Sequence, residues 1–129
     1  MSDSGTGQVI HVGRARVGFY GVSMKSLPSD LETAAQRFGS ELAWRPSDAR
    51  RVIEFLRDAG YAVLGVEIWT SEGASPKVWG WSVFEVHYDG DWHQFVQENA
   101  ARALRELEKP LPTQGLVNLT WIDETERGK

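Results

Sequence analysis

The stretch SDARRVIEFLRDAG (47–60), followed directly by YAVLGVEIWT (61–70), decides the fold class of this chain. Apolar residues in the first stretch recur every three or four positions, which is the spacing of one face of a helix. They are Ala49, Val52, Ile53, Leu56 and Ala59. We expect Ser47 to cap this helix, Asp48 to lie favourably at its positive end, and Gly60 to end it in a left-handed conformation. The second stretch is β-branched and broken by glycine, so it predicts a strand.

A second strand and a second helix follow. KVWGWSVFEVHY (77–88) has strand composition, and the turn-forming residues at 71–76 that separate it from the first strand predict an antiparallel hairpin. The next helix begins at Asp91, which is placed to cap it with Gln94 three residues on, and ends at Pro110. Its apolar face consists of Trp92, Phe95, Val96, Ala100, Ala103, Leu104 and Leu107.

Three further elements complete the order of the chain. Residues 8–22 predict one bent strand or two short ones, residues 30–38 a short helix closed by Gly39, and residues 116–122 a last strand. Because the clearest strands form a hairpin, the chain is predicted to be α+β. We expect an antiparallel or mixed sheet with two main amphipathic helices packed on one face.

Length and composition indicate one domain. A chain of 129 residues, 41% of them hydrophobic, has material for a single core, which we place at residues 8–122 between a flexible leader (1–7) and a polar tail (123–129). The absence of cysteine excludes disulfides and thiol catalysis. No run approaches the roughly 18 apolar residues of a membrane span, and the leader lacks the features of a secretory signal. We therefore expect a cytoplasmic protein without membrane contact.

Negative charge is concentrated in the middle of the chain. The formal net charge is −4, but residues 58–98 hold seven acidic residues against one base, Lys77, and so carry −6. Such a segment repels the phosphates of a nucleic acid, so we expect no nucleic-acid partner. The acidic segment would suit a basic protein partner, although acidic residues also serve simply to solvate one side of a fold.

Strand side chains alternate between two faces, so the predicted hairpin has an aliphatic face and a tryptophan-rich face. The aliphatic set, suited to lie under the helices, is Ala62, Leu64, Val66 and Ile68. The opposite set is Tyr61, Val63, Gly65, Glu67 and Trp69 on the first strand and Trp79, Trp81, Val83, Glu85 and His87 on the second. If this face is open, it offers three indole rings and two carboxylates to a partner. If the N-terminal strand or a loop covers it, the tryptophans are core residues.

No pattern in the sequence predicts catalysis or metal binding. HYDGDWH (87–93) holds two histidines and two aspartates, but it spans a strand end, a turn and a helix start, which favours turn and cap roles. Ser23 and Lys25 lack the further motifs that would identify a nucleophile. Glu67 and Glu85 could pair across the hairpin, but acid–base catalysis also needs a pocket. We therefore expect no catalytic, cofactor-binding or metal-binding residues.

Several features of residues 46–109 occur together in one known family. A helix with the pattern SxxRxVIxxL (47–56) precedes the strand VLGVEIW (63–69), and a tryptophan-bearing strand with WGW (79–81) is followed by a helix with FVxxxA (95–100). In these features the chain resembles the immunity protein 40 family, small bacterial proteins encoded beside polymorphic toxins. The resemblance implies inhibition by binding, in which the protein neutralises a cognate toxin by covering its active or binding surface.

The expected partner is therefore a toxin domain, bound without catalysis. The facing of the strands selects the contact residues, which are Glu67, Trp69, Trp79, Trp81 and Glu85 at the interface and Glu72 and Asp89 at its rim. One alternative is a non-toxin adaptor or interaction domain. Another is a small ligand-binding module or enzyme with a pocket against Trp79 and Trp81. A deep pocket with converging carboxylates would favour the last alternative, whereas a flat or convex surface favours protein binding.

Overall fold

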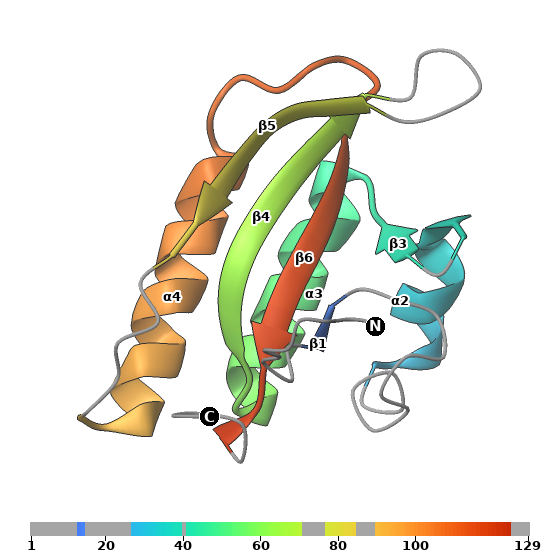
Figure 1. Cartoon of the computed structure of the whole chain (residues 1–129). Helices are drawn as coiled ribbons and strands as arrows, with labels where there is room; N and C mark the ends of the chain where they lie inside the picture. The colour runs from blue at the N-terminus through green and yellow to red at the C-terminus, as the bar shows by residue number, and fades with distance from the viewer. Residues whose placement is uncertain (1–12, 15–26, 40, 71–76, 85–89, 125–129) are drawn as a thin grey trace, which may run out of the picture.

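The structure is a computed structural model in which six strands and three helices are described (Figure 1). The described residues are 13–14, 27–39, 41–70, 77–84 and 90–124. In chain order the elements are β1 (Gly13–Arg14), α2 (Ser29–Ala34), β2 (Gln36–Phe38), β3 (Glu41–Ala43), α3 (Pro46–Ala59), β4 (Ala62–Thr70), β5 (Lys77–Val83), α4 (Trp92–Leu107) and β6 (Leu116–Ile122).

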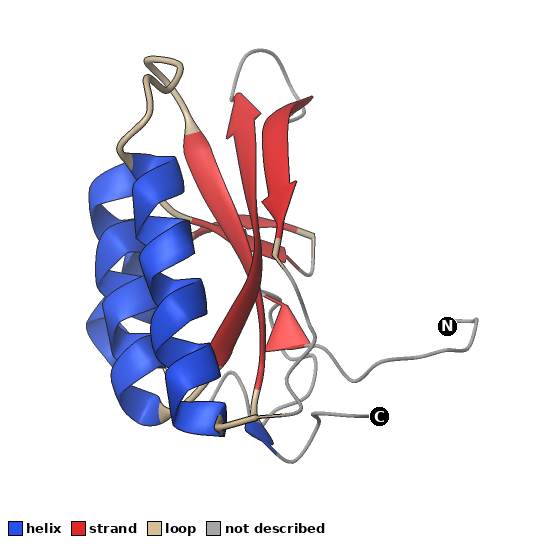
Figure 2. Ribbon diagram, turned by 90° about the vertical axis from the view of Figure 1, so that its left-hand side faces the viewer, coloured by secondary structure: helices blue, strands red, loops and turns tan. Residues whose placement is uncertain are grey.

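The predicted α+β class is confirmed. Four strands form one sheet in the order β1-β6-β4-β5, with every pair antiparallel, and β2 and β3 form a separate antiparallel hairpin. Helices α3 and α4 lie side by side on one face of the larger sheet (Figure 2). None of the helices in the described ranges combines the length and the apolar character needed to cross a bilayer.

The core lies between these two helices and the sheet. The buried stripe of α3 contains Val52, Ile53 and Leu56, which are inaccessible to solvent, and α4 contributes Ala100 and Ala103. In the same cluster, the two central strands contribute Val63, Val66, Ile68, Val117, Leu119 and Trp121. A second cluster packs Ala62, Leu64 and Ile122 of these strands with Trp92, Phe95 and Val96 of α4. Burial of aliphatic and aromatic side chains on this scale is the main favourable term in folding, at roughly 25 cal/mol per Å² of apolar surface.

Buried polar side chains attach the small β2–β3 hairpin to the large sheet. The Asn118 Nδ2 donates to the Leu42 carbonyl at 2.8 Å, and the backbone of Trp44 pairs with that of Val117 in both directions at 2.9 and 2.6 Å. The Trp44 indole Nε1 also donates to the carbonyl of Leu31 in α2, at 2.8 Å. Since buried polar groups must be paired, these bonds fix where the hairpin lies against β6.

The helix ends agree only partly with the prediction. Gly60 has φ of 89° and ends α3, as expected, and Asp91 caps α4 by accepting from the His93 backbone amide at 3.2 Å. The prediction for Ser47 is wrong, because Pro46 begins α3 and places Ser47 inside its first turn, with no side-chain cap. Proline suits this first position because its missing N–H would have no partner within the helix. Ala59, expected in the apolar stripe, is exposed.

The short helix predicted at residues 30–38 is wrong in its second half. Helix α2 ends at Ala34, and β2 then pairs with β3, a strand the sequence analysis did not assign. Gly39, with φ of 65°, supplies the turn of this hairpin and does not end a helix. Of the strand expected at 8–22, Gly13 and Arg14 pair with β6, and its other residues, like the leader 1–7 and tail residues 125–129, lie outside the described residues.

The left-handed conformation of Gly60 can be tested by Gly60→Ala. A Cβ at this position meets no atom within 4 Å, so only the backbone conformation opposes the substitution. We expect the free energy of unfolding, measured by urea denaturation, to fall by about 1 kcal/mol. The matched control is Gly90→Ala, where a Cβ also meets no atom within 4 Å but φ is not positive. Equal effects of the two substitutions would contradict this explanation of the end of α3.

Candidate functional site

The edge strand β5 carries the exposed large hydrophobic side chains of the described residues. They are Val78, Trp79, Trp81 and Val83, with exposed fractions of 55%, 54%, 65% and 70%. On its other edge β5 has no strand partner among the described residues. Natural edge strands are usually protected by charges or covered, but Lys77 is the only charged residue of β5. Large apolar side chains exposed on an edge strand are typical of an interaction site.

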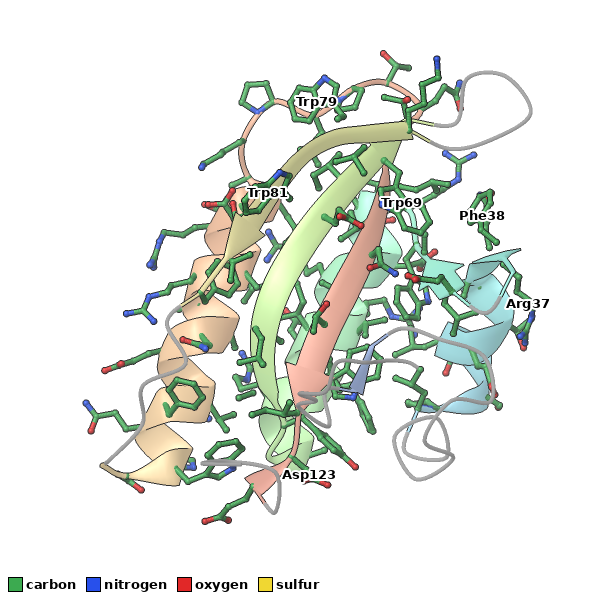
Figure 3. All side chains as sticks on the ribbon, in the orientation of Figure 1. Arg37, Phe38, Trp69, Trp79, Trp81 and Asp123 are labelled. Atoms are coloured by element: carbon green, nitrogen blue, oxygen red, sulfur yellow. The ribbon has the colours of Figure 1, made fainter. Side chains whose placement is uncertain are left out.

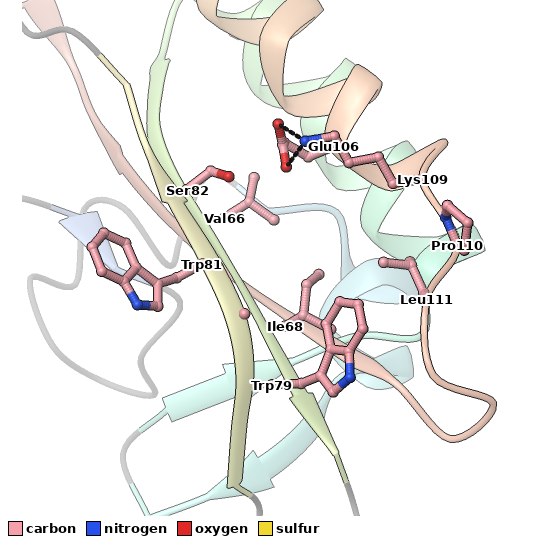
Figure 4. Close-up of a pocket in the computed structure, with 10 residues that line it drawn as sticks. Val66, Ile68, Trp79, Trp81, Ser82, Glu106, Lys109, Pro110 and Leu111 are labelled. Carbon is pink, nitrogen blue, oxygen red and sulfur yellow. Dashed lines mark hydrogen bonds and ion pairs between the residues drawn. The ribbon is translucent and has the colours of Figure 1, made fainter.

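The two exposed tryptophans point to opposite sides of the sheet. Gly80 pairs with Ile68 and Val78 pairs with Trp69, so Trp79 is an extra residue, a β-bulge. As a result, Trp79 lies on the side of β5 that faces the helices. Trp81 lies on the opposite side, here called the outer side or outer face of the sheet (Figure 4). The prediction that they share one face is therefore wrong, because strict alternation does not hold across a bulge.

A second bulge changes the facing of β4. The register with β6 shifts between Val63 and Gly65, so Val63 faces the helices together with Val66. The prediction that Val63 lies on the tryptophan-rich face is wrong for the same reason. Beyond this bulge, the predicted alternation of β4 holds, with Val66 toward the helices and Glu67 on the outer side.

On the helix side of β5 lies a cleft, here called the β5–α4 cleft, with a volume of about 580 Å³ (Figure 4). Its floor is formed by the core residues Val66 and Ile68, and its walls by Trp79, Pro110 and Leu111. The polar groups at one end are Ser82, Glu106 and Lys109. Most of this lining is apolar, which suits an aliphatic or aromatic group.

The charged groups of the β5–α4 cleft are paired with each other. Lys109 Nζ donates to both carboxylate oxygens of Glu106, at 3.1 and 2.9 Å. These hydrogen bonds, joined by one from Ser82, lower the pKa of Glu106 below its usual value. A carboxylate held ionised in this way is a poor proton carrier near neutral pH. The polar end of the cleft is therefore occupied by a closed ion pair.

The outer face is divided between a covered part and an open part. Trp69 is only 8% exposed, and the ring of Phe38 packs edge-on against it, with ring centroids 5.5 Å apart (Figure 3). Its indole Nε1 donates to Glu67 Oε1 at 2.8 Å. The alternative in which a second layer covers the tryptophans thus holds for Trp69, which the β2–β3 hairpin buries, while Trp81 is open.

The remaining predicted contact residues lie outside the described residues. They are Glu72, Glu85 and Asp89. Of the stretch 87–93, Asp91 is the cap of α4 and His93 is exposed on its first turn. Within the ranges that the structure describes, no group of three or more histidine, aspartate or glutamate side chains converges as metal ligands would.

Sequence reasoning missed the α4 side of the site. Glu106 and Lys109 were not among the predicted site residues, and Pro110 was expected only to end the helix, but all three line the cleft opposite β5. For the bulge in β5, by contrast, the sequence did hold a local signal: a glycine inside a strand, here Gly80 between two tryptophans, often marks a bulge.

Comparisons with known proteins add no assignment. No family model matches this chain, and no curated protein or solved structure matches it significantly. The function is therefore inferred from β5, from the β5–α4 cleft on its helix side and from the outer face of the sheet.

The different roles of Trp69 and Trp81 predict different effects on stability. We expect Trp69→Ala to lower the free energy of unfolding by about 3–5 kcal/mol, because it empties a packed site between sheet and hairpin. Trp81→Ala, which removes an exposed ring, should change it by less than about 0.5 kcal/mol. Urea denaturation followed by circular dichroism measures both. A large loss for Trp81→Ala would show that its ring is structural.

The Glu106–Lys109 pair predicts a specific dependence of stability on pH. The folded pKa of Glu106 is lowered, so its contribution to stability is complete above the ordinary pKa of 4.5 and is lost as pH falls through the folded value. Glu106→Gln should therefore lose less stability than the native chain as pH falls from about 5 to about 3. Identical acid unfolding profiles would contradict the pairing.

Proposed function

We propose that this protein acts by binding another protein at β5, and that it is an immunity protein that neutralises a cognate bacterial toxin without catalysis. The observation that carries the proposal is the exposure of Val78, Trp79, Trp81 and Val83 along a strand whose outer edge has no partner among the described residues. The resemblance to immunity protein 40 names the class of partner, and the chemistry of β5 supports protein binding in general.

The edge of β5 suits recognition by strand addition. An extended segment of a partner would pair with the free backbone groups of β5 and continue the antiparallel sheet. Its side chains would alternate between the β5–α4 cleft and the outer face, so both tryptophans would be covered. Burying an exposed tryptophan at the centre of an interface contributes on the order of 2 kcal/mol or more.

Neutralisation by binding is consistent with the charge of the chain. A molecule with a net charge of −4, and with its acidic residues concentrated in 58–98, attracts a basic surface and speeds the encounter. The apolar side chains of β5, once desolvated, slow dissociation. An inhibitor that covers its target needs both properties and no catalytic group.

Co-expression with the toxin domain encoded beside this gene tests the proposal. We expect the native protein to restore growth and Trp81→Ala to weaken the rescue, with an increase in Kd of about tenfold or more for the purified pair. Gln97→Ala, at an exposed position of α4, is the matched control and should rescue fully. If Trp81→Ala and Val83→Lys both rescue as well as the native protein, β5 is not the interface.

The β5–α4 cleft favours a second candidate, a module that binds a small apolar ligand, since its volume of about 580 Å³ is in the range of small-molecule sites. A fragment screen in which binding is monitored by the NMR signals of the Trp79 and Trp81 indoles distinguishes ligand binding from protein binding. A ligand of micromolar affinity, together with no rescue in co-expression, would replace toxin binding by ligand binding.

A further inference from the structure

We propose that the partner segment that adds to β5 carries an apolar residue and a basic residue at adjacent positions. The apolar side chain enters the β5–α4 cleft, and the guanidinium or ammonium group lies over Trp81 and pairs with Glu67. This inference rests on the proposed function, because it names the side chains by which a protein partner is recognised at β5.

Glu67 is a carboxylate prepared for a cation. It is partly buried, and the indole of Trp69 donates to its Oε1 at 2.8 Å, which holds the group in place. Among the ion pairs of the described residues, none includes Glu67. Partial burial weakens the hydration of a charge, so an incoming cation gains more here than at an exposed carboxylate.

Trp81 lies directly opposite Glu67 in the register of β4 and β5. Side chains of such a pair have Cβ atoms about 4.5–5.5 Å apart. Between them and around Gly65, Val83 and Thr120 lies a depression of about 110 Å³. Gly65 keeps it open because it has no side chain. A cationic group in this depression would contact the indole face of Trp81 and the carboxylate of Glu67 together.

The other face of β5 offers an apolar site. The floor of the β5–α4 cleft is Val66 and Ile68, and Trp79 and Leu111 stand on either side. Glu106 and Lys109 bind each other and so present no unpaired charge to an entering side chain. An aromatic or long aliphatic side chain therefore suits this cleft better than a charged one.

The two sites are reached from neighbouring positions of β5. Ser82 lines the cleft and pairs with Val66 on the helix side, whereas Trp81 pairs with Glu67 on the outer side. A residue added opposite Ser82 points to the cleft, and a residue added opposite Trp81 points to the outer face. Since these residues are neighbours in an added strand, the partner must carry its apolar and basic side chains in adjacent positions.

Three synthetic peptides of about twelve residues with a Thr/Val-rich host sequence test this geometry. The first has a central Phe-Arg pair, the second replaces Arg by its neutral isostere citrulline, and the third inserts one Thr between Phe and Arg. The inserted residue puts both side chains on the same face. We expect the first peptide to bind, and the second and third to bind about tenfold more weakly by calorimetry.

Glu67→Gln provides the decisive comparison. The amide keeps an acceptor for the Trp69 indole but removes the charge, so the preference for Arg over citrulline should disappear while citrulline binding is unchanged. Trp81→Ala removes the indole ring on the outer face and should also reduce the preference for Arg over citrulline. No binding of the Phe-Arg peptide at about 1 mM, or equal binding of all three peptides, overturns the inference.

Failure here is distinguishable from failure of the proposed function. If Trp81→Ala abolishes rescue in co-expression but the peptides do not discriminate, β5 is the interface and the adjacent apolar and basic pair is wrong. If the peptides discriminate as expected but the toxin domain is not bound, the site recognises such a segment in a protein other than a toxin.

Discussion

The pairing of β4 with β5, with one extra residue at Trp79, is the constraint on which the surface of this protein depends. Beyond the bulge, β5 continues antiparallel to β4, so Trp81 stays opposite Glu67. Without the extra residue, strict alternation would put Trp79 and Trp81 on the same outer face. One backbone irregularity therefore gives both faces of the edge strand a tryptophan.

The rest of the fold places β5 at the end of the sheet, with no strand on its outer edge among the described residues. Strand β4 is held on its other side by β6, and the helices α3 and α4 cover the face beneath it. The buried Asn118 and Trp44 fix the β2–β3 hairpin against β6, so the hairpin covers Trp69 but does not extend over Trp81. The core is thus complete without the exposed residues of β5, so substitutions of these residues should cost little stability.

Long periodic segments were predictable from the sequence, whereas features that depend on strand register were not. The stripe at Val52, Ile53 and Leu56, the stop at Gly60 and the cap at Asp91 follow from local spacing, and the structure confirms them. The β2–β3 hairpin was missed because its strands are three residues each and are fixed by contacts with β6, far away in sequence.

The sequence predicted which strand carries the candidate site, but not which way its side chains face. The abundance of tryptophan in 77–83 identified the segment, and Trp79 and Trp81 are exposed. Which side each faces depends on a bulge that appears only when β5 is aligned with β4. The cleft depends on where the end of α4 lies against the sheet, and periodicity within α4 carries no information on this.

Hydrogen exchange on the complex with the proposed toxin partner tests the central claim most directly. Amides of an edge strand that gains a pairing partner become protected. We predict that binding slows exchange most strongly within Lys77–Val83, and that the exposed faces of α3 and α4 are unchanged. Protection on those helices with no change in β5 would contradict the assignment of this strand as the binding edge.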